Sequence, residues 1–347
     1  MTAGRTQPLV ALQFDGQVLR ALDQRVLPWR EHHLELTTAE QVAQAIGTLA
    51  IRGAPLIGVA AAYGIALELR RDASDEGLTR TCGLLRGARP TAVNLHRAVD
   101  RVQARAAATA PAGRAEVALA EAAAIRSEEE QASQAIAQHG AELLADARVI
   151  LTHCNTGALA APGPGTALGV VAELAARGKP VSVIATESRP LLQGARLTAY
   201  ELARLGIPYQ LIVDAAAAGL LARGEIDAVI VGCDRVAANG DVANKVGTYG
   251  LALAARAAGV PFVVAGPTST VDLDCPGGEA IPIEERDPDE VRFAGGVLLT
   301  LPDRPARNPA FDVTPADLVT ALVTERGVIQ PVQAEQIQTL YASPGAR

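Results

Sequence analysis

Two side chains able to carry protons stand directly after short apolar runs of this sequence. Cys154 ends the stretch RVILTHC, and Asp234 ends the stretch DAVIVGCD. If each run is a buried strand, burial would raise the pKa of the Asp234 carboxyl group and let it exchange protons near neutral pH. Backbone N–H groups of the polar turn after Cys154 would orient its thiol or lower its pKa. The two residues predict acid–base chemistry at the ends of strands.

Each of these residues also has a purely structural interpretation. Cysteine is commonly a small buried hydrophobe, and Asp234 could instead cap a helix or pair with Arg235. His153 invites a Cys–His nucleophile, but adjacent side chains of a strand point to opposite faces. We therefore expect His153 to be a packed or hydrogen-bonded structural residue.

One candidate anion site lies in the stretch IRGAP. Arg52 is followed by the unobstructed backbone of Gly53 and Ala54, and Pro55 suits the first turn of a helix. A guanidinium beside a helix N-terminus is a natural clamp for phosphate. Arg89 also precedes a proline, in a comparable arrangement. We expect the two arginines to hold a phosphorylated small molecule in a cleft between two domains.

A second candidate anion site follows Asp234. After a polar, glycine-bearing loop, Asn244 and Lys245 are predicted to open a helix. Free N–H groups, the helix dipole and an ammonium would then combine to bind an anion. The alternative is a lysine that is simply solvated.

A rival pattern imitates a dinucleotide-binding fingerprint. Gly163, Gly165 and Gly169 precede a helix, and Glu187 ends the next strand about 20 residues on. The glycines follow the strand end by roughly ten residues instead of forming its tight turn, and Pro164 removes one N–H from the phosphate cradle. We therefore expect no nicotinamide cofactor.

The chain from Arg148 onward alternates short apolar runs with Ala- and Leu-rich helical segments. Strands that are apolar on both sides and separated by helices predict a doubly wound, Rossmann-like parallel sheet with helices on both faces. Ligands bind beyond the carboxyl ends of such strands. The polar residues expected there are Cys154, Glu187, Asp214 and Asp234. A last helix is predicted over 314–327, with Thr314 as its cap and Gly327 as its stop.

The N-terminal part predicts a smaller, mixed and mainly helical domain. Its expected bounds are 1–125, followed by a connecting helix over 126–147 and a Rossmann-like catalytic domain over 148–347. The connecting helix belongs to a segment from Arg114 to about Ala147 that is rich in Ala, Glu and Gln. The predicted fold class is therefore α/β with two domains.

Composition excludes several classes of function. The net charge of −7 and the 3% aromatic content leave no basic stripe and few stacking residues for nucleic acid. No apolar run reaches the ~20 residues of a membrane span, and the N-terminus lacks the pattern of a secretory signal. Four cysteines without a CxxC pair predict free thiols in a reducing cytoplasm and no zinc site.

Six stretches together resemble the methylthioribose-1-phosphate isomerases of methionine salvage. The resemblance runs from about residue 15 to 327, and the stretches are IRGAPLIG, ARPTAVN, THCNTG, ESRPLLQGARLTAYEL, GCDRVAANGDVANKVGTY and IPIEER. These enzymes belong to a superfamily shared with regulatory subunits of the eukaryotic initiation-factor nucleotide exchanger. The resemblance implies a homodimer of two-domain chains. Two departures from the family pattern are Ser188, where threonine is common, and Cys233, where alanine is common.

The same resemblance implies roles for individual residues. Cys154 and Asp234 would be the catalytic pair. The substrate would be held by Arg52, Gly53, Ala54, Arg89, Gln193, Asn244 and Lys245. No metal and no cofactor are implied.

The implied substrate is an aldose whose anomeric oxygen carries phosphate, so ordinary ring opening is blocked. We hypothesise that protonated Asp234 donates to the ring oxygen and that hydrogen then moves from C2 to C1, as a hydride or through an enol phosphate. Cys154 would carry a proton or stabilise the developing charge. The alternatives are a related substrate, 5-deoxyribose 1-phosphate or ribose 1,5-bisphosphate, or a non-catalytic regulatory subunit.

Overall fold

The computed structural model describes residues 9–342. These residues form two compact units, each with most of its contacts inside itself. Within the described range, one unit comprises residues 9–134 and 156–165, and the other comprises residues 135–155 and 166–342. The long helix α5 (Arg114–Leu143) supplies residues to both units. Within residues 9–342, no helix combines the length and the apolar character that crossing a bilayer requires.

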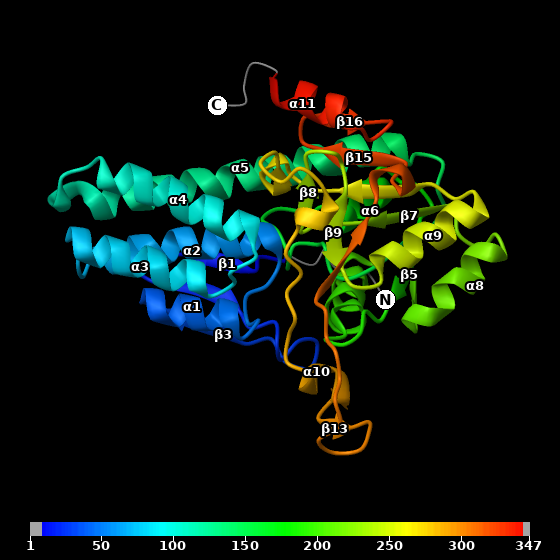
Figure 1. Cartoon of the computed structure of the whole chain (residues 1–347), viewed down its shortest axis with the longest axis horizontal. Helices are drawn as coiled ribbons and strands as arrows, with labels where there is room; N and C mark the ends of the chain where they lie inside the picture. Colours follow the sequence, from blue (N-terminus) through cyan, green and yellow to red (C-terminus); the bar gives the residue numbers. More distant parts are fainter. Residues whose placement is uncertain (1–8, 343–347) are drawn as a thin grey trace. The chain divides into compact units, whose positions relative to one another are not determined.

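The first unit is mixed and mainly helical, as the sequence predicts (Figure 1). Its antiparallel sheet has the order β1-β2-β3. Thr38 and Ser74 cap two of its helices by accepting hydrogen bonds from Gln41 N and Gly77 N. The elements are β1 (Leu12–Phe14), β2 (Leu19–Leu22), β3 (His33–Leu36), α1 (Ala39–Gly47), α2 (Ala54–Leu69), α3 (Asp75–Gly87), α4 (Val93–Ala107) and the short turn η1 (Pro111–Gly113).

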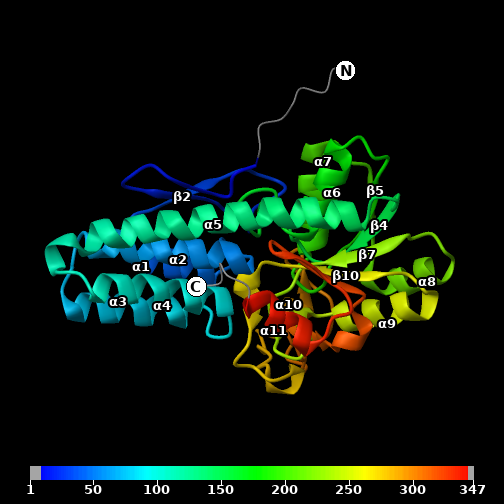
Figure 2. The same ribbon diagram turned by 90° about the horizontal axis from the view of Figure 1, so that it is seen from above.

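Helix α2 is the centre of this unit because its residues are buried on every side. The segment is made of alanine, glycine and larger apolar residues with no polar stripe, which is typical of a helix surrounded by other elements. Pro55 lies in the first turn, as predicted, where its missing N–H costs nothing. Helices α1, α3 and α4 pack against α2 (Figure 2).

The second unit is built on a seven-stranded sheet in the order β16-β15-β10-β7-β4-β5-β6. All neighbouring strands are parallel except the pair β15 and β16. The strands are β4 (Val149–Thr152), β5 (Ser182–Thr186), β6 (Tyr209–Ile212), β7 (Ala228–Val231), β10 (Phe262–Ala265), β15 (Ala321–Thr324) and β16 (Gly327–Ile329). Taken in chain order, the six parallel strands have the order 3-2-1-4-5-6 of a dinucleotide-type doubly wound sheet.

Helices cover both faces of this sheet, as expected (Figure 2). Alternate residues of the central strands enter two separate cores. Ile150 and Val183 pack with α5 and α6, while Leu151 and Ile184 pack with α8 and α9. The helices are α6 (Ala167–Ala176), α7 (Ala199–Leu205), α8 (Ala217–Ala222), α9 (Thr248–Ala258), α10 (Asp289–Arg292) and α11 (Ala334–Ala342). Strands buried on both faces explain the continuous apolar runs of the sequence.

A smaller sheet follows β7, where the sequence suggested only a loop. Its order is β11-β8-β9-β14, and β12 pairs with β13 as a separate hairpin. The strands are β8 (Arg235–Ala237), β9 (Val242–Lys245), β11 (Val271–Asp272), β12 (Phe293–Ala294), β13 (Val297–Leu298) and β14 (Phe311–Thr314). The remaining turns are η2 (Gly194–Thr198), η3 (Asp214–Ala216), η4 (Thr268–Thr270), η5 (Gly278–Ala280) and η6 (Ala316–Leu318).

The helix predicted over 314–327 is wrong. Thr314 ends β14, and the proline after it opens only the short turn η6. The apolar run that follows is β15, which is wholly buried and pairs with β10 through Val263 and Ala321. A short apolar run is compatible with both a helix and a buried strand. Here the run forms a strand because it pairs with the otherwise unpaired edge of β10.

The helix start predicted at Asn244 and Lys245 is also wrong. Both residues belong to β9, which pairs with β8 and β14. Helix α9 begins at Thr248, after a turn in which Gly247 has φ 104°. The turn glycine, which an L-residue would rarely replace, separates the strand from the helix.

Candidate active site

The strand order reverses between β4 and β7, where ligands of doubly wound sheets bind. These two strands are hydrogen-bonded neighbours, with Thr152 opposite Ile230. Cys154 is the second residue after β4, and Asp234 is the third residue after β7. Both predicted catalytic residues therefore follow the strands that form the switch point.

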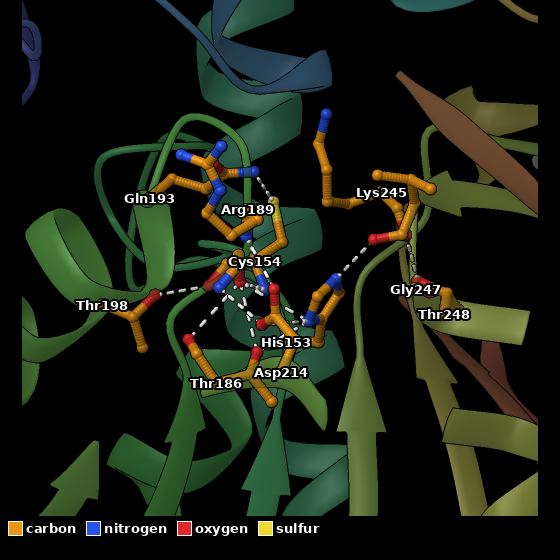
Figure 3. A network of polar contacts seen from close by, with 12 residues as sticks. His153, Cys154, Thr186, Arg189, Gln193, Thr198, Asp214, Lys245, Gly247 and Thr248 are labelled. Carbon is orange, nitrogen blue, oxygen red and sulfur yellow. Dashed lines mark hydrogen bonds and ion pairs between the residues drawn. The ribbon is translucent and has the colours of Figure 1, made fainter. Parts of the chain in front are cut away.

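Two hydrogen bonds hold the backbone of Cys154 in a strained conformation, and a third reaches its sulfur (Figure 3). Its φ of 68° is uncommon for a residue with a side chain, and such outliers persist only when the surroundings impose them. The N–H donates to Ser188 Oγ at 2.8 Å, and the carbonyl oxygen accepts from Thr198 Oγ1 at 2.6 Å. Gln193 Nε2 donates to the sulfur at 3.3 Å. The thiol, 7% exposed as a residue, is thus fixed in direction.

Gln193 offers a second polar atom beside the thiol. The residue is 3% exposed, and its Oε1 has no hydrogen-bond partner within residues 9–342. A buried acceptor left unsatisfied costs about 1–3 kcal/mol, so a ligand hydroxyl that donates to it would recover that energy. Gln193 thus presents an unsatisfied acceptor beside the thiol, and its role as a substrate contact, which the family resemblance implies, stays a prediction.

The segment that carries Gln193 comes close to the end of β5. It enters α7 through the π-helical turn η2, a rare feature that is frequent at functional sites. Ser188 and Leu192 also have positive φ values, of 60° and 57°. This backbone is held in place by Asp214, whose carboxylate accepts from the N–H groups of Ser188 and Arg189 at 2.7 and 2.8 Å.

Gly194→Ala is expected to destabilise the protein, because a Cβ atom at this position would lie 1.8 Å from the carbonyl oxygen of Thr186. The backbone must shift to relieve that overlap, at a cost of about 1–3 kcal/mol or more. The measurement is the free energy of unfolding from urea titration. Gly250→Ala is the matched control, since its Cβ would meet nothing within 4 Å and its stability should be equal or higher by up to about 1 kcal/mol. Equal stability of Gly194→Ala and the unmodified protein would contradict the close approach.

Asp234 lies in the connection from β7 to β8, and its N–H donates to Ala243 O at 2.9 Å. The helix-cap alternative is wrong for this residue, because a strand follows it. Arg235 forms an ion pair with Asp272, with 3.2 Å between Nη1 and Oδ2. Burial raises the pKa of the Cys233 thiol to about 12, and a hydrogen bond with Thr270 opposes this rise. Cys233 is therefore a poor nucleophile near neutral pH.

Lys245 and Asn244 are both buried in β9, near the start of α9. Lys245 Nζ donates to Ala310 O at 2.8 Å and lies 5.0 Å from the centre of the Phe311 ring. Asn244 Nδ2 donates to Thr248 Oγ1 at 3.0 Å. The ammonium and the amide are thus positioned by the strand, rather than by the first turn of a helix.

The N-terminus of α9 is already occupied by a carboxylate. Asp312 accepts from Gly247 N at 2.7 Å and from Tyr249 N at 3.1 Å. Burial raises the pKa of Asp312, while the two N–H donors and the charge of Lys245 lower it. The first turn of α9 therefore does not form the predicted anion site, because its dipole faces Asp312, and substrate binding by Asn244 and Lys245 stays a prediction.

Four of the predicted substrate contacts lie in the first unit. Arg52 precedes α2, Gly53 is its N-cap and Ala54 is its first residue. Arg89 lies between α3 and α4, and its carbonyl oxygen accepts from Ala92 N at 3.1 Å. Both arginines have intermediate exposure. Each guanidinium thus precedes a helix in the chain, as the sequence analysis expected.

Several polar residues of the site escaped the sequence analysis. Ser188 was noted only as a departure from a family pattern, yet its hydroxyl accepts the N–H of Cys154. Next in the chain after the cysteine, Asn155 Nδ2 donates to Glu201 Oε1 at 2.7 Å and to Thr198 Oγ1 at 3.3 Å. The only signal in the sequence was the dense polar motif ESRPLLQGARLTAYEL. Within residues 9–342, no group of three or more His, Cys, Asp or Glu side chains is arranged to hold a metal ion.

Comparison with known proteins gives consistent results. The profile of the Initiation factor 2 subunit family matches residues 50–331. A protein of Anaeromyxobacter sp. (strain K) named methylthioribose-1-phosphate isomerase is 55% identical, over 97% of this chain and 98% of its own length. A Moorella thermoacetica protein named 5-deoxyribose 1-phosphate isomerase is 50% identical, over 97% of this chain and 98% of its own. The crystal structure of 5-methylthioribose 1-phosphate isomerase from Pyrococcus horikoshii OT3 has a TM-score of 0.88 and 38% identity, covering 97% of this chain and 96% of that one.

Proposed function

The chain belongs to the Initiation factor 2 subunit family, and from that premise we propose that it is an aldose–ketose isomerase converting 5-methylthioribose 1-phosphate to 5-methylthioribulose 1-phosphate in methionine salvage. One observation carries the proposal. A protein named methylthioribose-1-phosphate isomerase is 55% identical over 97% of this chain. In this chain, moreover, Cys154 and Asp234 follow the neighbouring strands β4 and β7 of the switch point.

The reaction explains why an acid and a second polar group are needed. Phosphate on the anomeric oxygen prevents the sugar from opening to a free aldehyde. Protonated Asp234 donates to the ring oxygen, so the C1–O bond of the ring breaks and C1 gains cationic character. Hydrogen then moves from C2 to C1, and C2 becomes the carbonyl carbon of the ketose. The C2 hydroxyl group loses its proton in this step, and that proton returns the Asp234 carboxylate to its acid form. The conversion is redox neutral, because the hydrogen lost by C2 is gained by C1.

Cys154 serves at the reacting carbons in this proposal. The hydrogen bond from Gln193 Nε2 directs the sulfur, which either carries a proton or stabilises developing positive charge. Gln193 Oε1 is the acceptor for a substrate hydroxyl. The nitrogen of the buried Gln193 amide thus contacts Cys154, and its oxygen contacts the substrate.

The residues proposed to bind the substrate are basic or polar. Arg52, with the backbone of Gly53 and Ala54, and Arg89 provide guanidinium and N–H donors, and Lys245 with Asn244 provides an ammonium and an amide.

The substituent at C5 is the least constrained feature of the substrate. The Moorella thermoacetica relative is named for 5-deoxyribose 1-phosphate, which differs from methylthioribose 1-phosphate only at that carbon. A hydrophobic contact with one methylthio group is worth only about 1–3 kcal/mol, or 10- to 200-fold in kcat/KM. We therefore assign methylthioribose 1-phosphate as the preferred substrate and 5-deoxyribose 1-phosphate as a poorer one.

The test supplies the purified protein with methylthioribose 1-phosphate, 5-deoxyribose 1-phosphate or ribose 1,5-bisphosphate and follows the ketose carbonyl by ¹³C NMR. The expected result is a ketose from the first sugar, with kcat/KM about 10- to 200-fold higher than for the second. A higher kcat/KM for either alternative sugar would reassign the substrate. Absence of ketose from all three sugars would favour a regulatory, non-catalytic subunit instead.

We further propose that the protein is a cytoplasmic homodimer. The four cysteines Cys82, Cys154, Cys233 and Cys275 are all free, which suits a reducing compartment. Light scattering should give twice the mass of one chain, whereas the mass of a single chain would contradict the dimer.

A further inference from the structure

His153 lies between two parts of the site and bonds to both. It is 1% exposed, its Nδ1 lies 2.6 Å from Thr186 Oγ1, and its Nε2 lies 2.9 Å from Val246 O (Figure 3). A carbonyl oxygen can only accept, so the hydrogen of this second contact must be on Nε2. A neutral imidazole with hydrogen on Nε2 accepts at Nδ1, and the hydroxyl of Thr186 is then the donor.

The hydroxyl groups of Thr186 and Ser188 extend these hydrogen bonds from His153 to Cys154. Thr186 Oγ1 lies 3.2 Å from Ser188 Oγ, and Ser188 Oγ accepts from Cys154 N at 2.8 Å. Because the hydrogen of Thr186 is directed at His153, the hydrogen between the two hydroxyls comes from Ser188. Four hydrogen bonds therefore run in one direction, from Cys154 N–H through Ser188, Thr186 and His153 to Val246 O.

The far end of this chain of hydrogen bonds is the turn after Lys245. Val246 N donates to Ala310 O at 3.1 Å, and Gly247 N donates to Asp312. A Cβ atom on Gly247 would lie 3.2 Å from His153 Nε2, so the imidazole packs directly on the turn backbone. The carbonyl oxygen of Val246 is thus the point where the β4 side of the site is joined to the Lys245 segment.

We propose that His153, as the neutral Nε2–H imidazole, is a positioning residue that fixes the Cys154 turn relative to the Lys245 segment. The proposal rests on the function proposed above. Protonation would place a hydrogen on Nδ1 as well, and the Thr186 hydroxyl could no longer donate to it. The direction of all the bonds up to Cys154 would then have to change.

Two charged groups face the imidazole from other elements. Asp214 Oδ1, at the start of η3, lies 4.0 Å from Nδ1, and Lys245 lies on β9. Burial lowers the pKa of His153, the bond to Val246 and the charge of Asp214 oppose that shift, and Lys245 adds to it. The lowered pKa agrees with a neutral ring at pH 7.

Two substitutions of His153 each remove one of its two hydrogen bonds and keep the other. In His153→Asn the side-chain oxygen takes the place of Nδ1 and still accepts from Thr186, but no donor reaches Val246. In His153→Gln the amide nitrogen takes the place of Nε2 and still donates to Val246, but the acceptor for Thr186 is lost. Since one buried hydrogen bond changes an equilibrium by about tenfold, each variant should affect one end by that factor.

The expected result is a split in the kinetic constants for methylthioribose 1-phosphate. His153→Asn should raise KM about tenfold with kcat within about threefold, because the Lys245 segment is released. His153→Gln should lower kcat about tenfold with KM within about threefold, because the Cys154 turn is released. His139→Gln is the control: His139 Nδ1 lies 2.9 Å from Thr324 O, outside the site, and both constants should be unchanged. Equal changes of kcat and KM in both His153 variants, or none, would overturn the proposal.

A measurement without substrate separates this proposal from the assigned function. ¹⁵N NMR of histidine-labelled protein, with the His153 signals assigned by their loss in His153→Asn, should give a neutral ring protonated on Nε2 at pH 7. A ring protonated on Nδ1, alone or together with Nε2, would overturn the proposal even if the enzyme is active. If the unmodified protein converts none of the three sugars, the assigned function fails while this test still applies.

His153 also gives the proposal a pH signature in stability. Its pKa in the folded protein is below the ordinary value of about 6.5, so the unfolded chain binds the extra proton as pH falls below that value. The free energy of unfolding should therefore fall as pH drops from 7 to 5, and this fall should be smaller in His153→Asn. An identical pH dependence in both proteins would contradict the neutral buried ring.

Discussion

Asp234→Asn is expected to turn over methylthioribose 1-phosphate about 10²- to 10⁴-fold more slowly than the unmodified protein, with little change in KM. The amide keeps the shape of the carboxyl group but has no acidic hydrogen for the ring oxygen. Because the acid acts only as the C1–O bond breaks, its loss raises the barrier without weakening substrate binding. Steady-state kinetics followed by NMR measures both constants.

The control for this substitution makes the same chemical change at a surface ion pair. Asp317 lies 2.6 Å from Arg256, and both side chains are largely exposed. Exposed pairs contribute at most about 1 kcal/mol, so Asp317→Asn should keep the kinetic constants of the unmodified protein. Turnover of Asp234→Asn within about threefold of normal would exclude Asp234 as the acid.

Cys154→Ser is expected to lower kcat by at least about 10²-fold while the protein keeps its stability. Serine is similar in size and can adopt the same backbone conformation, but its hydroxyl is far less acidic and less polarizable than a thiol. The hydrogen bonds to Ser188 and Thr198 use the backbone of residue 154 and remain. The reacting group therefore changes while its position is kept.

Cys233→Ser provides the matched control for the thiol. Cys233 Sγ lies 3.3 Å from Thr270 Oγ1, a contact that a hydroxyl can also make. The kinetic constants of this variant should stay within about threefold of normal. If Cys233→Ser loses as much activity as Cys154→Ser, the assignment of the reactive thiol fails.

The doubly wound sheet was predictable because its strands are buried on both faces. The runs that became β7 and β10 are apolar at every position, those that became β4 and β5 have Ser or Thr only at their ends, and helical segments of suitable length separate the four runs. Pro55 predicted the start of α2 for a local reason, its fixed φ. The ends of the strands then located Cys154 and Asp234, since polar residues directly after buried strands mark the edge of the sheet.

The errors arose where a distant partner decides the local structure. The run that became β15 lies between a proline and a glycine that fit a helix, and only the open edge of β10 makes it a strand. Lys245 precedes a helix, but pairing of β9 with β14 keeps it in a strand. The local sequence pattern of a segment does not show with which distant strand the segment will pair.

The hydrogen bonds around Cys154 were also beyond the sequence. They join residues from β5, from the segment after it and from the turn before α9, which lie up to 93 positions apart in the chain. Their side chains are ordinary Thr, Ser and His, whose partners depend on how three loops meet. The sequence could indicate that His153 is structural, but not which atoms it connects.

Infrared difference spectroscopy between the unmodified protein and Asp234→Asn at neutral pH, without substrate, tests the central claim most directly. The account requires the Asp234 carboxyl group to hold its hydrogen before the sugar arrives. It predicts that the C=O band of a protonated carboxyl group is present in the unmodified protein and absent from the variant. A difference spectrum that contains only bands of an ionised carboxylate would contradict the account.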